Sequence, residues 1–383
     1  MSHPPQRVGP PLPRRIRKVG APLGAIIAMG TVAGLIIILL TAANPVGTAI
    51  GFVLATVALL VVLLCYLWLD RWEPEPPRLL VLAFLWGASV AVVVSIGLEL
   101  FFGTLFPTDE ADTGGFITLA VGAPVIEEAL KGIFLLIMMT GLRRNEMNSL
   151  TDCLVYAGLT AAGFAWVENI AYIGGGEDLG GSLLTAALRL IMGPFAHPLF
   201  TTFTGIGVYF ALHQRNALGK AGCIVLGYLG AVIMHGLWNG SSVVGIEAYF
   251  LVYVFWMVPI FIFAIVLAVR SRRREQRIVS EKLPNMVAAG LVTPNEATWL
   301  GSIKTRKLVV GEATRQGGKA AGRSVKDFAA QVVELAFVRD RIDRGFGDER
   351  VQALLNEEAY GVHAARAAAP DLQRLAAFRA PGR

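Results

Sequence analysis

Two glutamates and a lysine lie within five residues of each other inside an apolar stretch of the chain. Glu127 and Glu128 are followed by Lys131, at helical spacings of four and three that place the side chains together. A charge at the centre of a membrane span costs about 2.5–3.5 kcal/mol, so such residues indicate a functional site. Because adjacent carboxylates repel each other, one is expected to hold a proton or bind a cation. A buried ion pair that only fixes helix packing would need a single acid.

A third acid follows in the next apolar segment. Glu168 precedes Asn169 there, and at 1.5 Å per residue it lies roughly 22 Å from the expected inner end of its segment. Glu127 lies roughly 15 Å from the outer end of its own segment, near the middle of the membrane. Alone, Glu168 could form a helix–helix hydrogen bond, the usual role of Asn169. Beside a segment with two glutamates, we interpret Glu168 as a third site acid.

Two of the five histidines lie near the middle of the two following segments. His197 is followed by Thr201 and His235 by Asn239, each four residues later and therefore on the same helix face. A single buried histidine is usually a core residue. Two at matching depth on adjacent antiparallel segments, facing three carboxylates, are better interpreted as metal ligands or acid–base groups.

These groups could together perform hydrolysis. No two of them have the local spacing of an HExxH motif, so four helices must assemble the site, as helical bundles do when they direct Glu and His toward a metal. Two histidines and a carboxylate with an open position form a catalytic zinc set. A remaining glutamate can take a proton from the water that the metal acidifies. Water-activated attack on a peptide carbonyl in the membrane plane then becomes possible.

The composition indicates a membrane protein with a polar C-terminal part. The chain has 383 residues, of which 55% are hydrophobic and 16% charged, and its mean hydropathy is +0.59. Soluble domains carry about 25% charged residues, so disorder is excluded and an ordinary cytosolic enzyme is not expected. Residues 1–270 carry a net charge of −1 and residues 271–383 carry +7. The basic pI therefore reflects the tail and predicts no nucleic-acid partner.

Eight apolar segments are long enough for a bilayer core, which needs about 20 residues of helix. They cover residues 21–41, 47–69, 79–101, 117–140, 153–173, 183–212, 221–243 and 249–269. Lys and Arg lie in every second connection, which predicts that both termini are cytoplasmic. We expect an all-α polytopic protein with a cytoplasmic basic arm (1–20), an eight-helix domain (21–270) and a cytoplasmic tail (271–383) that is partly helical or disordered.

In this order, the motifs resemble those of the PrsW-type intramembrane proteases, within the superfamily that includes the CAAX prenyl endopeptidases. The matching pieces are Glu127-Glu128-x-x-Lys131, Phe164-x-x-x-Glu168-Asn169, His197-x-x-x-Thr201 and His235-x-x-Trp238-Asn239. The segment Asp70-Arg-Trp-Glu73-Pro-Glu75-Pro also looks like the family's. The resemblance covers about residues 65–270.

The resemblance implies a multi-pass plasma-membrane peptidase that cuts a single-span protein in the lipid bilayer. The family's type member is similar in role to a site-1 protease for a membrane-anchored anti-sigma factor. The implied roles are water activation by Glu127 and Glu128, zinc binding by Glu168, His197 and His235, and support by Lys131, Asn169, Thr201 and Asn239. CAAX-processing relatives have been argued to use glutamate alone and carry His where Glu168 stands. A metal-dependent and a glutamate-only mechanism therefore both stay open.

Other interpretations also stay open at this point. A proton- or cation-coupled transporter uses similar intramembrane residues, although the chain shows no clear internal repeat and no pair of broken helices. A non-catalytic scaffold is the third class. Asp70–Pro77 is expected to form a rigid elbow because its prolines force an extended turn. Glu99 and Arg189 lie near outer span ends, where we interpret Glu99 as interfacial and leave open whether Arg189 pairs with the site.

Overall fold

The protein is helical throughout in this computed structural model, which describes residues 21–106, 113–347 and 349–378. No strand occurs in these ranges, which confirms the all-α fold class. The predicted basic arm at residues 1–20 lies outside the described residues. The chain divides into a membrane unit that ends at Arg273 and a C-terminal unit that begins at Arg274.

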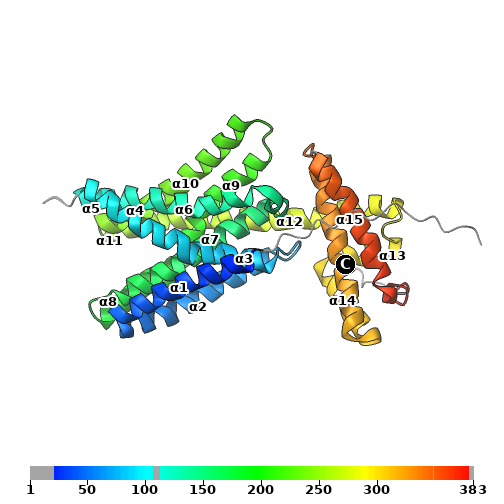
Figure 1. Ribbon diagram of the computed structural model, residues 1–383, viewed down its shortest axis with the longest axis horizontal. Helices are drawn as coiled ribbons and strands as arrows, with labels where there is room; N and C mark the ends of the chain where they lie inside the picture. Colours follow the sequence, from blue (N-terminus) through cyan, green and yellow to red (C-terminus); the bar gives the residue numbers. More distant parts are fainter. Residues whose placement is uncertain (1–20, 107–112, 348, 379–383) are drawn as a thin grey trace, which may run out of the picture. The chain divides into compact units, whose positions relative to one another are not determined.

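The membrane unit contains eight helical segments that follow the eight expected spans (Figure 1). In chain order they are α1 (Leu23–Ala43); α2 (Pro45–Leu69); α3 (Pro77–Leu85), η1 (Trp86–Ala91) and α4 (Val92–Leu105); α5 (Thr113–Ile117), η2 (Thr118–Gly122) and α6 (Ala123–Met138); α7 (Leu150–Gly174); α8 (Leu179–Ala186), η4 (Ala187–Met192) and α9 (Ala196–Leu212); α10 (Ala217–Val244); and α11 (Ile246–Val252), η5 (Tyr253–Met257) and α12 (Val258–Ala288). A short 3₁₀ helix, η3 (Gly141–Glu146), lies between α6 and α7.

Seven helices of the described chain are long and apolar enough to cross a membrane. The remaining segment, which ends in α6, is the one that carries Glu127, Glu128 and Lys131. Its charges distinguish it from the other spans, and ten residues of α6, including all three charged ones, are buried. The segment with the least lipid-compatible sequence is therefore shielded by the others.

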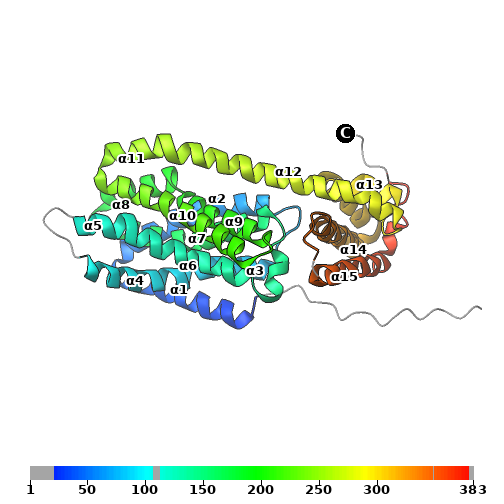
Figure 2. The same cartoon turned by 90° about the horizontal axis from the view of Figure 1, so that it is seen from above.

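The helix α7 lies at the centre of the membrane unit (Figures 1 and 2). Its start is fixed by a capping box between Ser149 and Asp152. In its apolar 18-residue stretch, 89% of the residues are buried. Small residues let neighbouring backbones approach it closely. A Cβ atom on Gly163 would lie 1.9 Å from the Phe84 carbonyl oxygen, and one on Gly87 would lie 1.8 Å from the Thr160 carbonyl oxygen. The central position of α7 carries Glu168 into the interior.

Four spans contain a π-helical turn, and one span is broken. The π turns are η1, η2, η4 and η5, and such turns occur frequently at functional sites. The sixth segment is interrupted at residues 193–195, so α9 begins at Ala196. The sequence could unwind at Gly193-Pro194 or at His197-Pro198, and the break falls at the first of these.

The C-terminal unit is also helical, which confirms the expected helical character of the tail. It contains the end of α12, then α13 (Pro294–Leu300), α14 (Ile303–Asp343), α15 (Glu349–Ala367) and the short η6 (Pro370–Leu372). Gly318 has a φ of 77° and kinks α14, because glycine adopts this conformation without steric cost. Arg366 bonds to Glu296 and lies 4.9 Å over the Phe328 ring. The tail therefore has a packed core of its own.

Candidate active site

Lys131 lies at the centre of the site, with its ammonium group against four side chains. Its Nζ atom lies 2.9 Å from a carboxylate oxygen of Glu127 and of Glu128. Nζ also lies 3.0 Å from Nδ1 of His197 and 4.0 Å from the centre of the Phe164 ring. The lysine side chain is fully buried. A buried ammonium is tolerable here because opposite charges and hydrogen bonds offset its desolvation.

His197 lies in the first turn of α9 and is oriented by a carboxylate on α7. Its Nε2 atom lies 2.7 Å from Oε2 of Glu168. The same oxygen lies 2.6 Å from Nη2 of Arg189 on η4, and the Arg189 Nε–H donates to Asn169 Oδ1 at 2.7 Å. Because Nε2–H donates to the carboxylate, Nδ1 of His197 keeps a lone pair and accepts from Lys131.

His235 on α10 is oriented in the same way from the other side. Its Nδ1 atom lies 3.1 Å from Oε1 of Glu128, and its ring stacks on Phe200 at 4.8 Å. Thr201 donates to the second oxygen of Glu128 at 2.8 Å. With its proton on Nδ1, His235 presents the Nε2 lone pair, which lies 3.9 Å from Oε2 of Glu127.

The two adjacent glutamates therefore differ in their freedom to react. Both oxygens of Glu128 are engaged, by Lys131, His235 and Thr201. Among the described residues, Glu127 accepts a hydrogen bond from Lys131 only. Its Oε2 atom also lies 3.9 Å from the lone-pair nitrogens of both histidines. Glu127 thus has acceptor capacity left for a proton, whereas Glu128 is a fixed structural anchor.

The cluster is one positive charge short of neutrality. The carboxylates of Glu127, Glu128 and Glu168 contact two permanent cations, Lys131 and Arg189. This count takes both imidazoles in the neutral tautomers in which His197 Nδ1 accepts from Lys131 and His235 Nδ1 donates to Glu128. Since an uncompensated buried charge is strongly destabilising, this cluster favours the uptake of a proton or a metal ion.

Three residues of the cluster fit a zinc ion. Glu127, His197 and His235 each offer a ligand atom, and these atoms lie within 4.8 Å of one another. Two imidazoles and a carboxylate are the donor set of many catalytic zinc sites. Carboxylates also orient both imidazoles, Glu168 behind His197 and Glu128 behind His235, as is typical of metal-binding histidines. The ammonium of Lys131 would have to release His197 when an ion binds.

The cluster includes every predicted site residue except Asn239. One member has a different place from the predicted one: the sequence placed Glu168 in the metal set, whereas its carboxylate is directed at Arg189 and at Nε2 of His197. Asn239 lies outside the cluster, because its Nδ2 atom donates to the Leu119 carbonyl oxygen at 3.1 Å. Arg189, which the sequence left open, joins the cluster. The available signal was a lone arginine inside an apolar segment, at the same outer depth as Glu168.

The site lies within a stretch similar to known proteins. Residues 75–264 match the family described as PrsW family intramembrane metalloprotease. The chain is also 25% identical over 211 residues to Protease PrsW of Oceanobacillus iheyensis, an alignment that covers 55% of this chain and 91% of that protein. No solved structure matches. All residues of the cluster fall inside the matched stretch, and the C-terminal unit falls outside it.

Proposed function

We propose that this protein hydrolyses a peptide bond of a single-span membrane protein inside the bilayer, because residues 75–264 match the family of PrsW intramembrane metalloproteases and the chain is similar to Protease PrsW. The substrate we propose is a regulator of the anti-sigma-factor type, with the enzyme in the plasma membrane and both termini in the cytoplasm. The observation that supports this best is the cluster of two buried glutamates, two buried histidines and a buried lysine, with the half-buried Glu168 beside them, in a membrane-crossing bundle. Ionisable side chains are energetically costly inside a membrane, so their presence there indicates a functional site.

Glu127 is the general base in this proposal. A water molecule between Glu127 and the Nε2 lone pair of His235 would give its proton to the carboxylate as it attacks the scissile carbonyl. Glu127 would then pass the proton to the leaving amine, so the carboxylate is restored. The positive charge of Lys131 stabilises the negative charge that develops on the carbonyl oxygen. Glu128 keeps Lys131 and His235 in place through its three hydrogen bonds.

The metal in this proposal is zinc, which one carboxylate oxygen of Glu127 would hold together with His197 and His235. The other oxygen of Glu127 would then be the one that accepts the proton of the attacking water. When bound, the metal would polarise the scissile carbonyl and lower the pKa of the attacking water. Glu168 and Glu128 fix the imidazole tautomers so that both lone pairs face the site. The same His235 tautomer is needed for a glutamate-only reaction, in which its imidazole orients the water.

A membrane-proteome comparison tests the function. Cells expressing the wild-type protein should contain shortened single-span proteins that cells expressing Glu127→Gln at equal level lack. General acid–base catalysis contributes about 10²–10⁴-fold, so cleavage by Glu127→Gln should fall by at least about 100-fold. The control is Glu177→Gln, at an exposed acid in the connection between α7 and α8, and it should cleave normally. Absence of any shortened protein, with cation flux that depends on Glu127, would identify a transporter instead.

Metal analysis of the purified protein tests the zinc assignment separately. Wild type should carry about one zinc per chain, and His235→Ala should lose most of it because one of three protein ligands is gone. Glu177→Gln serves again as the control that keeps the metal. Cleavage by a wild-type preparation without stoichiometric metal would contradict the zinc assignment and favour the glutamate-only reaction.

A further inference from the structure

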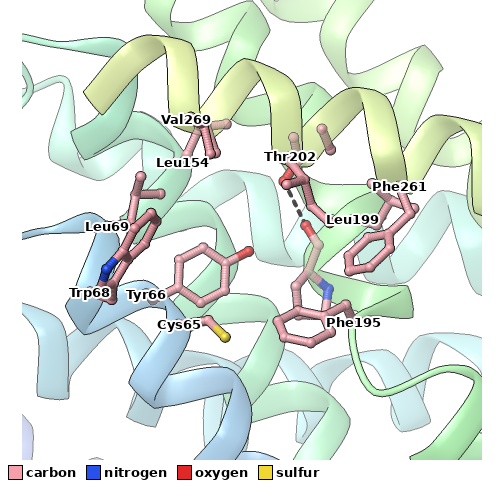
Figure 3. A pocket seen from close by; sticks show the side chains of 14 residues that line it. Cys65, Tyr66, Trp68, Leu69, Leu154, Phe195, Leu199, Thr202, Phe261 and Val269 are labelled. Carbon is pink, nitrogen blue, oxygen red and sulfur yellow. Dashed lines mark hydrogen bonds between the residues drawn. The ribbon is translucent and has the colours of Figure 1, made fainter. Parts of the chain in front are cut away.

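A cavity lies in the membrane unit, on the side of α9 that faces away from the proposed catalytic cluster. It is lined from α2, α7, α9 and α12 and has a volume of about 390 Å³ (Figure 3). On α9, Pro198, Leu199 and Thr202 line it, whereas His197 and Thr201 are directed at the glutamates. The cavity is therefore separate from the proposed active site.

The lining of this cavity is almost entirely apolar, and one side is open. Apart from Cys65, Tyr66 and Thr202, its lining residues are hydrocarbon, aromatic or proline side chains. Thr202 bonds to the Pro198 carbonyl oxygen, so its hydroxyl is already satisfied. Ile265 is 47% exposed and Trp68 is 43% exposed, so the cavity opens on the surface of the bundle. In a membrane-crossing bundle, that surface faces lipid chains.

An arginine side chain, Arg272, lies at one end of the cavity. On α12, Ile265, Ala268 and Val269 line the wall, and Arg272 follows them at spacings of seven, four and three residues on the same helix face. Its guanidinium lies 3.9 Å over the ring of Trp68, which itself lines the cavity. Next to it, Ser271 bonds to Thr151 on α7 at 2.8 Å and fixes the helix there.

We propose that this cavity binds an anionic phospholipid, with one acyl chain between α2, α9 and α12 and the phosphate against Arg272. The charge pattern carries the assignment, because an apolar slot that ends in an arginine complements an amphiphile with a negative head. Basic pockets between spans on the cytoplasmic side are known to take anionic lipid heads, and the sequence predicts that this end of α12 is cytoplasmic. The volume lies within the usual range for small ligands.

Native mass spectrometry of the full chain tests the charged end of the site. The protein in detergent is incubated with phosphatidylglycerol or with phosphatidylcholine of the same acyl chains, and retained lipid is counted. Wild type should retain about one phosphatidylglycerol in preference to phosphatidylcholine. Since a basic residue near a lipid head contributes about 1 kcal/mol, Arg272→Gln should weaken retention about fivefold. The matched control is Arg273→Gln, an exposed neighbour that points to another face of α12, which should retain lipid like the wild type.

The apolar end is tested with a filled cavity and with a probe. Ala268→Trp should remove retained lipid of both kinds while Arg272 is intact. A fluorophore on Cys65, in a Cys223→Ser background with Cys153 buried, should be quenched by brominated phosphatidylglycerol, and this measurement needs no bulky substitution in the cavity and leaves Arg272 in place. Equal retention of the two lipids by wild type, equal losses in both arginine variants, or no quenching at Cys65 would overturn the proposal. A photo-crosslinker at Cys65 that captured a polypeptide in place of lipid would do so too.

Discussion

The membrane unit buries carboxylates in two places, and their partners differ. In the cluster, Glu127 and Glu128 lie against the Lys131 ammonium. At the elbow after α2, both oxygens of Asp70 accept the backbone N–H of Glu75, and the Glu75 carboxyl accepts the Tyr156 hydroxyl at 2.6 Å. Within the described chain, neither elbow acid forms an ion pair. Both elbow carboxyls are nonetheless buried, at 6% and 4% exposure.

This difference separates acids that react from acids that hold the chain. Burial raises the pKa of Asp70 to about 7 and raises the pKa of Glu75 well above its usual value, with the Asp152 charge adding to both. The elbow acids thus tend toward the neutral form, which suits a hydrogen-bonded turn. The cluster instead balances its acids with fixed cations and keeps one glutamate open. A buried acid therefore indicates chemistry when a cation and an unused acceptor accompany it.

The largest expected loss of stability comes from a substitution that removes the shared cation of the cluster. Lys131→Met leaves Glu127 and Glu128 without their shared cation, and removal of one partner of a buried ion pair costs about 3–5 kcal/mol. Thermal unfolding in detergent should show a large loss of stability and no cleavage. The double variant Lys131→Met/Glu128→Gln should recover part of the stability because one unpaired charge is gone.

The elbow provides the matched control for this effect. Glu75→Gln keeps the acceptor for Tyr156 and removes no ion pair, so it should cost far less than Lys131→Met and leave cleavage intact. Wild-type stability in Lys131→Met would contradict the comparison, since it would mean that the cluster acids are neutral like those of the elbow.

The next effect concerns how the cluster orients its histidines. Arg189→Gln removes the charge that holds Glu168 behind His197 but can still bond to Asn169. Loss of such an orienting partner typically costs about 10–100-fold in activity. In a reconstituted cleavage assay the loss should fall on kcat with KM unchanged, because Arg189 touches no substrate.

Two further variants separate orientation from general damage. Arg189→Lys should recover part of the rate by restoring a positive charge beside Glu168. Arg215→Gln, at an exposed arginine in the connection before α10, should have wild-type kinetics. A rise in KM alone in Arg189→Gln would place this arginine at the substrate and not behind His197.

The sequence predicted the depth of each site residue in the membrane but not the direction in which its side chain points. Hydropathy located all eight segments, and counting along them placed Glu127, His197 and His235 near the same depth, as the cluster has them. Helix phase did not predict the partners of two residues. Arg189 lies in the π turn η4 and pairs with Glu168, and such a turn has no reliable signal in a single sequence. Asn239 lies four residues after His235 in the continuous helix α10, yet it bonds to Leu119 of η2. Which neighbouring segment a side chain meets required the structure.

The smallest expected effect is a pH dependence that originates at the elbow. Burial raises the pKa of Asp70 from 3.8 to about 7, so the folded protein binds this proton more tightly than the unfolded chain. Stability from this group is therefore full below about pH 4, falls as the pH rises toward 7, and is constant above that. Asp70 should contribute about 2 kcal/mol more to the free energy of unfolding at pH 5 than at pH 7.5. Asp70→Asn should reduce the wild-type pH dependence by about this amount and leave the part that Glu75 contributes, whereas Glu177→Gln, at an exposed acid, should change nothing; thermal unfolding at the two pH values measures both. A wild-type protein that lost stability on acidification, with Asp70→Asn insensitive, would mean that Asp70 is a paired anion, and the contrast between elbow and cluster would fail.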